Sequence, residues 1–450
     1  MANSDISVRQ HERMINTPMP RLIASMALPT TLSQLVTVLY NTADTYFVAK
    51  LGTSATAAVG VVFSVMAVIQ AIGYGLGMGS NSIISRALGA KDDDKAHLYG
   101  SSAVAAALLL GLLVAIIGLS ATQPILRALG STETMLPYAC DYARYILISA
   151  PIMCASFTLN AILRAEGMAV LAMWGLCAGG ILNIALDPLF IFTFNMGAAG
   201  AALATAISQF ISFIILLSEF LRGKSIVKLS PRYVSLRMSD YIAIVRMGMP
   251  TIFRQGLASV SSALISIQGG HYGDAALAAI TIANKVYMLM RNIVVGIGQG
   301  FQPVAGYNYG AGNKRRVREA FRVSCIIGTV FCTLAAIIGW LFARQIAGIF
   351  SVDPEVLTIC VRAIYRLSLI TPFLAYSTFV NQLYQSLGFS VPATFLASCR
   401  QGIFFIPIIL ILPPLIGFDG VILAQPGADF ITFLISVPFQ IVFYRKVLKK

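Results

Sequence analysis

Charged residues are scarce in this chain and make up 11% of its 450 residues, whereas soluble globular proteins carry roughly 25%. Histidine is also rare, and His11, His97 and His271 are far apart in the sequence. The sequence contains no HExxH motif, nucleophile elbow or phosphate-binding loop. These absences disfavour a membrane enzyme, and we predict that the chain is not an enzyme.

Cysteine gives no sign of a disulfide framework or a metal site. The seven cysteines are scattered, lie mostly in apolar runs and form no CxxC pair. Such cysteines are typical of small packing residues. We expect no organic cofactor.

Long hydrophobic runs are what the chain has in abundance: 57% of its residues are hydrophobic, and the mean hydropathy is +0.80. Helical runs of about 20 residues cross the ~30 Å bilayer core, and one soluble core could not bury so many. We therefore expect an all-α polytopic membrane protein with twelve transmembrane helices. Their approximate ranges are 22–46, 56–82, 98–121, 137–162, 169–193, 198–220, 241–267, 275–302, 318–342, 357–384, 392–413 and 419–443. The polar start of the chain does not resemble a signal peptide, so the first span should remain as an anchor.

Lysine and arginine are concentrated on alternate loops. One set of loops holds only Lys50, Arg127 and Arg344. The other set, with both ends of the chain, holds Arg9, Arg13, Arg21, Arg86, Lys91, Lys95, Arg164, Arg222, Lys224, Lys228, Arg232, Arg237, Lys314, Arg315, Arg316, Arg318, Arg445, Lys446, Lys449 and Lys450. This bias predicts a multi-pass protein of the cell membrane with both termini in the cytoplasm. Because the charges lie in short loops rather than on one face, we expect no nucleic-acid partner.

The chain repeats itself at an offset of 221 residues. "MALPTT" (26–31) pairs with "MGMPTI" (247–252), and "GYGLGMG" (73–79) pairs with "VVGIGQG" (294–300). An even number of spans in each half makes the repeat parallel. We expect an N-lobe (residues 1–220), a basic cytoplasmic linker (221–240) and a C-lobe (241–450), forming two pseudo-symmetric six-helix lobes around a central cavity. The glycine clusters are expected to serve close helix packing rather than ligand binding.

Two carboxylates lie inside predicted spans, where each costs on the order of 2.5–3.5 kcal/mol at a helix centre. Asp44 lies on the first span and Asp187 on the fifth. At the repeat offset their partners are Ile265 and Ile408. We therefore expect the polar site to belong to the N-terminal half alone.

Neutral oxygens accompany these carboxylates. Asn183 lies four residues before Asp187 and shares its helix face, and Pro188 leaves the carbonyl of Ile184 without a helical donor. Asn160 and Thr205, on the fourth and sixth spans, add an amide and a hydroxyl. Such oxygens suit a proton or a hard cation such as Na⁺. In the alternative interpretation, Asp187 and Asn183 only bond each other and a neighbouring helix, and Asp44 is a surface residue.

With these residues in view, the sequence resembles the MATE (multidrug and toxic compound extrusion) family, in its bacterial multidrug and DinF-like branches. The resemblance covers nearly the whole chain and depends on "ISRALGAKD" (84–92), "ILRAEG" (162–167), "NIALDPLFIF" (183–192), "GAAGAALATAIS" (197–208) and "RQGIFFIP" (400–407). It implies twelve helices in two lobes and cation-coupled efflux of amphipathic, often cationic compounds.

The family resemblance also implies that the cation site consists of Asp44, Asn160, Asn183, Asp187 and Thr205. Other branches of the family use a glutamate on the seventh helix, and "GMPTIFRQGLASVSS" (248–262) contains none. Coupling through the C-lobe is therefore in doubt.

We expect a secondary antiporter that exchanges drug-like molecules for H⁺ or Na⁺. Candidate substrate contacts are Gln34, Tyr40, Met66 and Met288, because aromatic, amide and methionine surfaces adapt to varied ligands. For all but Tyr40, ordinary packing or lipid contact is the competing interpretation. The expected partners are small molecules and membrane lipid, and we expect a monomer.

The main alternative is a lipid-linked oligosaccharide flippase with a similar two-lobe core. Cations in or near the C-terminal spans favour it, because a basic cavity would attract an anionic substrate. They are Arg254, Arg291, Arg362, Arg366 and Arg400. A channel is a further alternative, although no repeated pore-lining pattern is evident.

Overall fold

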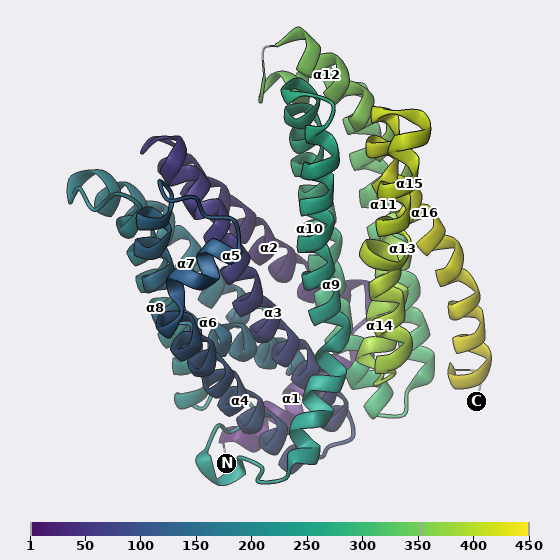
Figure 1. Ribbon diagram of the computed structural model, residues 1–450. Coiled ribbons are helices and arrows are strands. Elements are labelled where there is room, and N and C mark those ends of the chain that lie inside the picture. The colour runs from purple at the N-terminus through teal and green to yellow at the C-terminus, as the bar shows by residue number, and fades with distance from the viewer. Residues whose placement is uncertain (1, 352, 449–450) are drawn as a thin grey trace.

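The computed structural model describes residues 2–351 and 353–448, which fold almost entirely into helices. Figure 1 shows two helical bundles side by side. The N-lobe contains α2 (Met19–Ala49), α3 (Thr53–Gly89), α4 (Asp93–Ser120), α5 (Thr122–Ala128), α6 (Leu136–Ala165), α7 (Ala169–Pro188), η1 (Leu189–Thr193) and α8 (Gly197–Leu221). The C-lobe contains α9 (Met238–Gly270), α10 (Asp274–Gly310), α11 (Lys314–Leu341), α12 (Ala343–Gly348), α13 (Pro354–Ser386), α14 (Ser390–Ser398), η3 (Cys399–Ile403), α15 (Phe405–Ile416), α16 (Phe418–Phe443) and η4 (Tyr444–Leu448).

The predicted membrane architecture is confirmed, with one difference. Within the described residues, eleven helices are long and apolar enough to cross a membrane, and α9 is not among them. At 33 residues α9 has the necessary length, but its arginines, serines and glutamines lower its hydropathy. Its packing against α3, α10 and α14 nevertheless places it inside the helical assembly.

The outer helices expose large apolar side chains, as lipid-facing helices do. On α4, Leu109 and Ile116 are exposed, and on α11, Leu334 and Ile338 are exposed. Apolar patches of this extent are rare on monomeric soluble proteins. The exposed faces therefore fit contact with lipid tails.

The lobes meet along a seam formed by α2 and α3 on one side and α9 and α10 on the other. Glycines allow this approach, because a Cβ at any of them would fall 2.0–2.6 Å from a backbone atom of the opposite lobe. The pairs are Gly79 with Ile244, Gly300 with Ala27, Gly89 with Tyr307, and Gly310 with Arg86. The last two pairs are related by the repeat offset. The predicted packing role of the glycine clusters is thereby confirmed.

Hydrogen bonds cross the same seam. The Thr30 hydroxyl donates to the carbonyl of Gly296 at 2.7 Å. Arg164 is only 3% exposed, and its guanidinium donates to the side chain of Gln299. Our placement of Arg164 in a loop is therefore wrong, because it lies in the last turn of α6 and its side chain turns inward and bridges the two lobes.

The seam occupies one end of the molecule, and the lobes diverge toward the other end (Figure 1). The polar N-terminal segment forms α1 (Ala2–Asn16) at the closed end. The segment between the lobes, with the short helix η2 (Pro231–Tyr233), also lies there. Glu166, which follows α6, is fully buried and fastens this segment by accepting bonds from Ser225 Oγ at 2.6 Å and from the Ile226 amide at 2.9 Å.

Candidate cation-binding site

Asp44 lies in the interior of the N-lobe rather than at its surface. It belongs to α2, which continues as regular helix past this residue to Ala49, and only 3% of Asp44 is exposed. The hydroxyl of Tyr142 on α6 donates to Asp44 Oδ2 at 3.0 Å. The alternative in which Asp44 is a surface residue is therefore wrong.

Asp187 lies where α7 changes its helical geometry. The α-helix ends at Pro188 and continues as the π-helix η1, since proline removes one backbone donor. Single π-helical turns occur often at functional sites. Asp187 has no exposed surface.

Asn183 joins the second carboxylate to α8. Its side-chain nitrogen donates to Asp187 Oδ1 at 3.3 Å and to Thr205 Oγ1 at 3.1 Å. Four of the five predicted site residues thus lie in two hydrogen-bonded groups in the interior of one lobe. One group is Asp44 with Tyr142, which was not predicted, and the other is Asp187 with Asn183 and Thr205.

Three oxygen atoms of this cluster are buried and lack a hydrogen-bond partner within the described residues. They are Asp44 Oδ1, Asn183 Oδ1 and Asp187 Oδ2. Buried polar atoms are normally satisfied, so orphaned oxygens require an explanation. A proton or a hard cation would satisfy acceptors of this kind, because carboxylate and amide oxygens are the ligands that such cations prefer.

Asn160 differs from the other predicted residues. It is buried, and its side-chain nitrogen donates to the carbonyl of Ala172 on α7 at 2.7 Å. Asn381 makes the corresponding bond to Ala393 at 2.5 Å in the C-lobe. Since both lobes have this bond, the nitrogen of Asn160 serves helix packing.

The four predicted substrate contacts have unlike surroundings. Tyr40 is buried, one helical turn before Asp44, and lies against Gly180 of α7. Gln34 is half-buried on α2, and Met288 is exposed on α10. Met66 is buried in the hydrophobic core of the N-lobe, so a ligand would reach it only if the core opened.

Sequence reasoning missed two polar residues of the interior. Tyr142 carries no charge, and it lies 98 residues from Asp44; no sequence spacing links them. Asp429 is only 3% exposed on α16 of the C-lobe, a buried carboxylate that the sequence analysis did not single out. The signal was available, because "AQPGADF" places an acid inside a predicted span.

Three of the five C-lobe arginines considered above are paired with carboxylates. Arg362 and Arg366 form ion pairs with Asp419, at 3.5 and 2.7 Å. Arg400 pairs with Asp429 at 2.6 Å. Asp429 therefore lies in a network that differs from the N-lobe cluster, whose carboxylates have no arginine partner within the described residues.

The family model that matches the chain is MatE, over residues 29–189 and 250–411. The two matched segments begin at the repeat offset and include most of both lobes. The chain belongs to the MatE family. The resemblance inferred from the sequence motifs is thereby confirmed, and the protein is a membrane transporter of this family.

Named relatives of this MatE chain cover most of its length. It is 28% identical over 399 residues to the multidrug export protein MepA of Staphylococcus saprophyticus, covering 88% of each chain. It is 28% identical over 412 residues to MepA of Staphylococcus aureus, covering 90% of each. A solved structure, an outward-facing multidrug resistance MATE transporter of the MOP superfamily, is 25% identical with a TM-score of 0.91, covering 96% of this chain and 98% of that one.

Proposed function

We propose that this protein is a secondary active multidrug antiporter, which exports amphipathic, often cationic compounds in exchange for inward movement of H⁺ or Na⁺. The main support is the cluster of unsatisfied oxygens on Asp44, Asn183 and Asp187 inside one lobe. Ionisable groups inside a membrane protein mark ion pathways and proton relays. The names of the MepA relatives support multidrug export.

Helix α2 offers a route from the ion site to the seam. Asp44 lies in its second half, and Thr30, which bonds Gly296 of the C-lobe, lies in its first half. Pro29, the residue before Thr30, cannot donate a hydrogen bond to the carbonyl of Ser25 and so weakens α2 there. Neutralising Asp44 and Asp187 changes the packing of α2 and, through Pro29, the seam.

The divergence of the lobes agrees with one state of an alternating-access cycle. If the termini lie in the cytoplasm, as the charge distribution predicts, the lobes open toward the outside. An entering cation then reaches Asp44 and Asp187 from outside, and the exported compound leaves by the same opening. Each charge that moves inward contributes about 2.3 kcal/mol per 100 mV of membrane potential.

Transport in proteoliposomes tests this proposal. Ethidium movement is measured with an H⁺ gradient and a Na⁺ gradient imposed separately, for the native protein, Asp187→Asn and the matched control Asp94→Asn, whose carboxylate is exposed. We expect one gradient to drive export in the native protein and the control, and no gradient to drive it in Asp187→Asn. Gradient-driven export that persists in Asp187→Asn would overturn the assignment.

A flippase of lipid-linked oligosaccharides is the second candidate. Arg254 and Arg291, which have no carboxylate partner within the described residues, favour it. A drug-accumulation assay run beside a cell-wall precursor assay separates the two functions. If cells that lack the protein lose precursor export without any change in drug accumulation, the flippase is favoured.

A further inference from the structure

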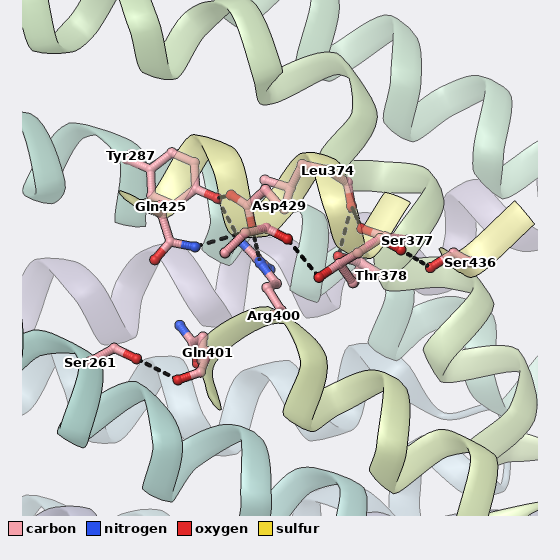
Figure 2. A network of polar contacts seen from close by, with 12 residues as sticks. Ser261, Tyr287, Leu374, Ser377, Thr378, Arg400, Gln401, Gln425, Asp429 and Ser436 are labelled. Atoms are coloured by element: carbon pink, nitrogen blue, oxygen red, sulfur yellow. Dashed lines mark hydrogen bonds and ion pairs between the residues drawn. The ribbon is translucent and has the colours of Figure 1, made fainter. Parts of the chain in front are cut away.

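In the C-lobe, the carboxylate of Asp429 lies in a polar network with Arg400, Tyr287 and Gln425, and the charges of Asp429 and Arg400 cancel. Figure 2 shows the guanidinium of Arg400 pointing toward Asp429 and Tyr287. Its Nε lies 2.6 Å from Asp429 Oδ1, and its Nη2 donates to the Tyr287 hydroxyl at 2.6 Å. Tyr287 donates to the other oxygen of Asp429, and Gln425 Nε2 donates to Oδ1 at 3.1 Å. Both oxygens of Asp429 therefore have donors, and the charge of Arg400 is compensated.

Two further guanidinium groups, on Arg254 of α9 and Arg291 of α10, lie next to this network. Gln401, which follows Arg400 in η3, contacts both of these residues. Within residues 2–351 and 353–448, neither Arg254 nor Arg291 forms an ion pair with a carboxylate. The three arginines therefore share a single compensating carboxylate.

Gln401 bridges the backbone of Arg254 and the guanidinium of Arg291. In the orientation that satisfies both ends of its amide, the nitrogen donates to the Arg254 carbonyl at 3.0 Å and the oxygen accepts from Arg291 Nη1 at 2.6 Å. The Ser261 hydroxyl fixes the same turn by donating to the Gln401 carbonyl at 2.7 Å (Figure 2). Gln401 supplies a dipole but no negative charge.

These arginines lie beside the seam between the lobes. Ile252, two residues before Arg254, contacts Gly75 of α3. Gly296, five residues after Arg291, contacts Thr31 of α2. Arg254 and Arg291 therefore lie at the level of the seam along α9 and α10.

We propose that Arg254 and Arg291 form a binding site for an anionic group, a carboxylate or a phosphate carried by an amphipathic molecule. Unpaired charges inside a membrane protein are costly and mark functional sites. Guanidinium groups bind carboxylate and phosphate with two parallel hydrogen bonds. The N-lobe interior is acidic and this part of the C-lobe is basic, so the site extends the protein's ligands to zwitterions and anions. It does not depend on cation coupling, and a binding assay tests it without transport.

The first test compares two dyes that differ only at one carboxyl group. Rhodamine B carries a free carboxylate, and its ethyl ester does not. We expect the purified native protein to bind rhodamine B about tenfold more tightly than the ester, because a hydrogen bond to a charged group is worth about one factor of ten or more. Arg254→Gln and Arg291→Gln should each remove this preference.

Three controls keep the test decisive. Arg315→Gln removes an exposed positive charge of the same type and should leave the preference unchanged. Arg291→Lys keeps the charge without the two-bond geometry and should retain part of it. If the Gln variants do not fold, inorganic phosphate is added to the native protein, where it should compete with rhodamine B and not with the ester.

A lipid arm identifies the source of the anionic group. Native mass spectrometry compares retention of phosphatidylglycerol and phosphatidylcholine by the same variants. Arginine-dependent retention of phosphatidylglycerol supports a lipid phosphate, and arginine-dependent preference for rhodamine B supports a substrate carboxylate. The proposal is overturned if the native protein shows neither preference, or if both preferences survive in Arg254→Gln and Arg291→Gln.

Discussion

At the scale of single residues, the N-lobe site depends on which acceptors have donors. Tyr142 supplies one hydrogen bond to Asp44, and Asn183 supplies one to Asp187. The remaining oxygens of both carboxylates have none within the described residues. The hydrogen bonds fix the carboxylates in place, and the unsatisfied oxygens are the atoms that we propose bind the coupling ion.

Tyr142→Phe removes the one bond to Asp44 and keeps the ring. A hydrogen bond to a charged group contributes about 1.5–3 kcal/mol, so we expect the ion concentration for half-maximal ethidium transport to shift by about tenfold or more. Without this bond Asp44 holds a proton more firmly, so the H⁺ concentration for half-maximal transport should fall. If Na⁺ is the coupling ion, the same proton competes with it at Asp44, so the Na⁺ concentration should rise. Transport kinetics at graded ion concentrations measure the shift. An unchanged value would place the ion away from Asp44.

Glu166, which lies outside the membrane spans, predicts that the stability of the fold depends on pH. Burial raises the pKa of its carboxyl group from 4.5 to about 7, despite the bonds from Ser225, Ile226 and Val227. Between these values the folded protein keeps a proton that the unfolded chain has released. Stability should therefore fall as the pH rises from about 4.5 to about 7, on the order of 3 kcal/mol in total.

Thermal denaturation in detergent at a series of pH values checks this expectation. In Glu166→Gln the fall between pH 4.5 and 7 should be absent. Glu133→Gln removes an exposed carboxylate and should behave like the native protein. The same slope in Glu166→Gln and in the native protein would show that another group titrates.

Single site residues could be predicted from helix periodicity and from the free-energy cost of placing a carboxylate inside a membrane. Asp187 and Asn183 were placed together because they are four residues apart on one helix, and the expense of a carboxylate in a membrane singled out Asp44. Tyr142 was not predicted because burying an uncharged tyrosine in a membrane has little free-energy cost. Its bond to Asp44 is also a tertiary contact, which the sequence does not show. The compensation of Asp429 by Arg400 also depends on tertiary contacts, between α16 and η3.

At the scale of helices, the sequence predicted the positions of the spans well, because the length of each hydrophobic run can be read directly from the sequence. The predicted span at 137–162 is α6, Leu136–Ala165, and the one at 419–443 is α16, Phe418–Phe443. The π-helical turns η1 and η3 were not predicted, since an apolar run has the same composition in either helical form. The sequence predicted only close packing at the glycines, because a glycine does not indicate which helix packs against it.

Gly248 on α9 offers a test of the seam. A Cβ there would lie 2.2 Å from the carbonyl oxygen of Gly75, a backbone atom that cannot rotate away. Overpacking of this kind costs about 1–3 kcal/mol, so Gly248→Ala should lower the population of the closed seam by about tenfold or more. Gly256→Ala, which meets no atom within 4 Å, is the matched control.

Spin labels at Thr53→Cys and Asp274→Cys, in a background without the native cysteines, report the seam at the diverging end of the lobes. We expect a shorter mean distance in Gly248→Ala than in Gly256→Ala, because opening the seam brings the far ends together. Identical distance distributions in the two variants would mean that the glycine contact does not control the state.

At the scale of the whole molecule, the orientation in the membrane remains a prediction from charge. Leu236, in the segment between the lobes, is 99% exposed, and Ile349, after α12, is 77% exposed. In intact cells a membrane-impermeant maleimide should label Ile349→Cys and leave Leu236→Cys unlabelled until the cells are permeabilised. The reverse pattern would place both termini outside.

The two-lobe architecture followed from the repeat, because two similar halves fold alike and pack about a shared axis. Their difference in charge did not follow from it. The N-lobe holds carboxylates without arginine partners, and the C-lobe holds arginines in excess of carboxylates. This polarity is a property of side chains at positions that the repeat does not preserve.

In the proposed mechanism, exported compounds and the coupling ion exclude each other through Asp187 and Asp44. The most direct measurement is the dissociation constant of ethidium for the purified protein, at graded H⁺ and at graded Na⁺ concentrations. We predict that one ion weakens ethidium binding in the native protein and in Asp94→Asn, and that Asp187→Asn abolishes this dependence. An ion dependence that is equally strong in Asp187→Asn would contradict the account.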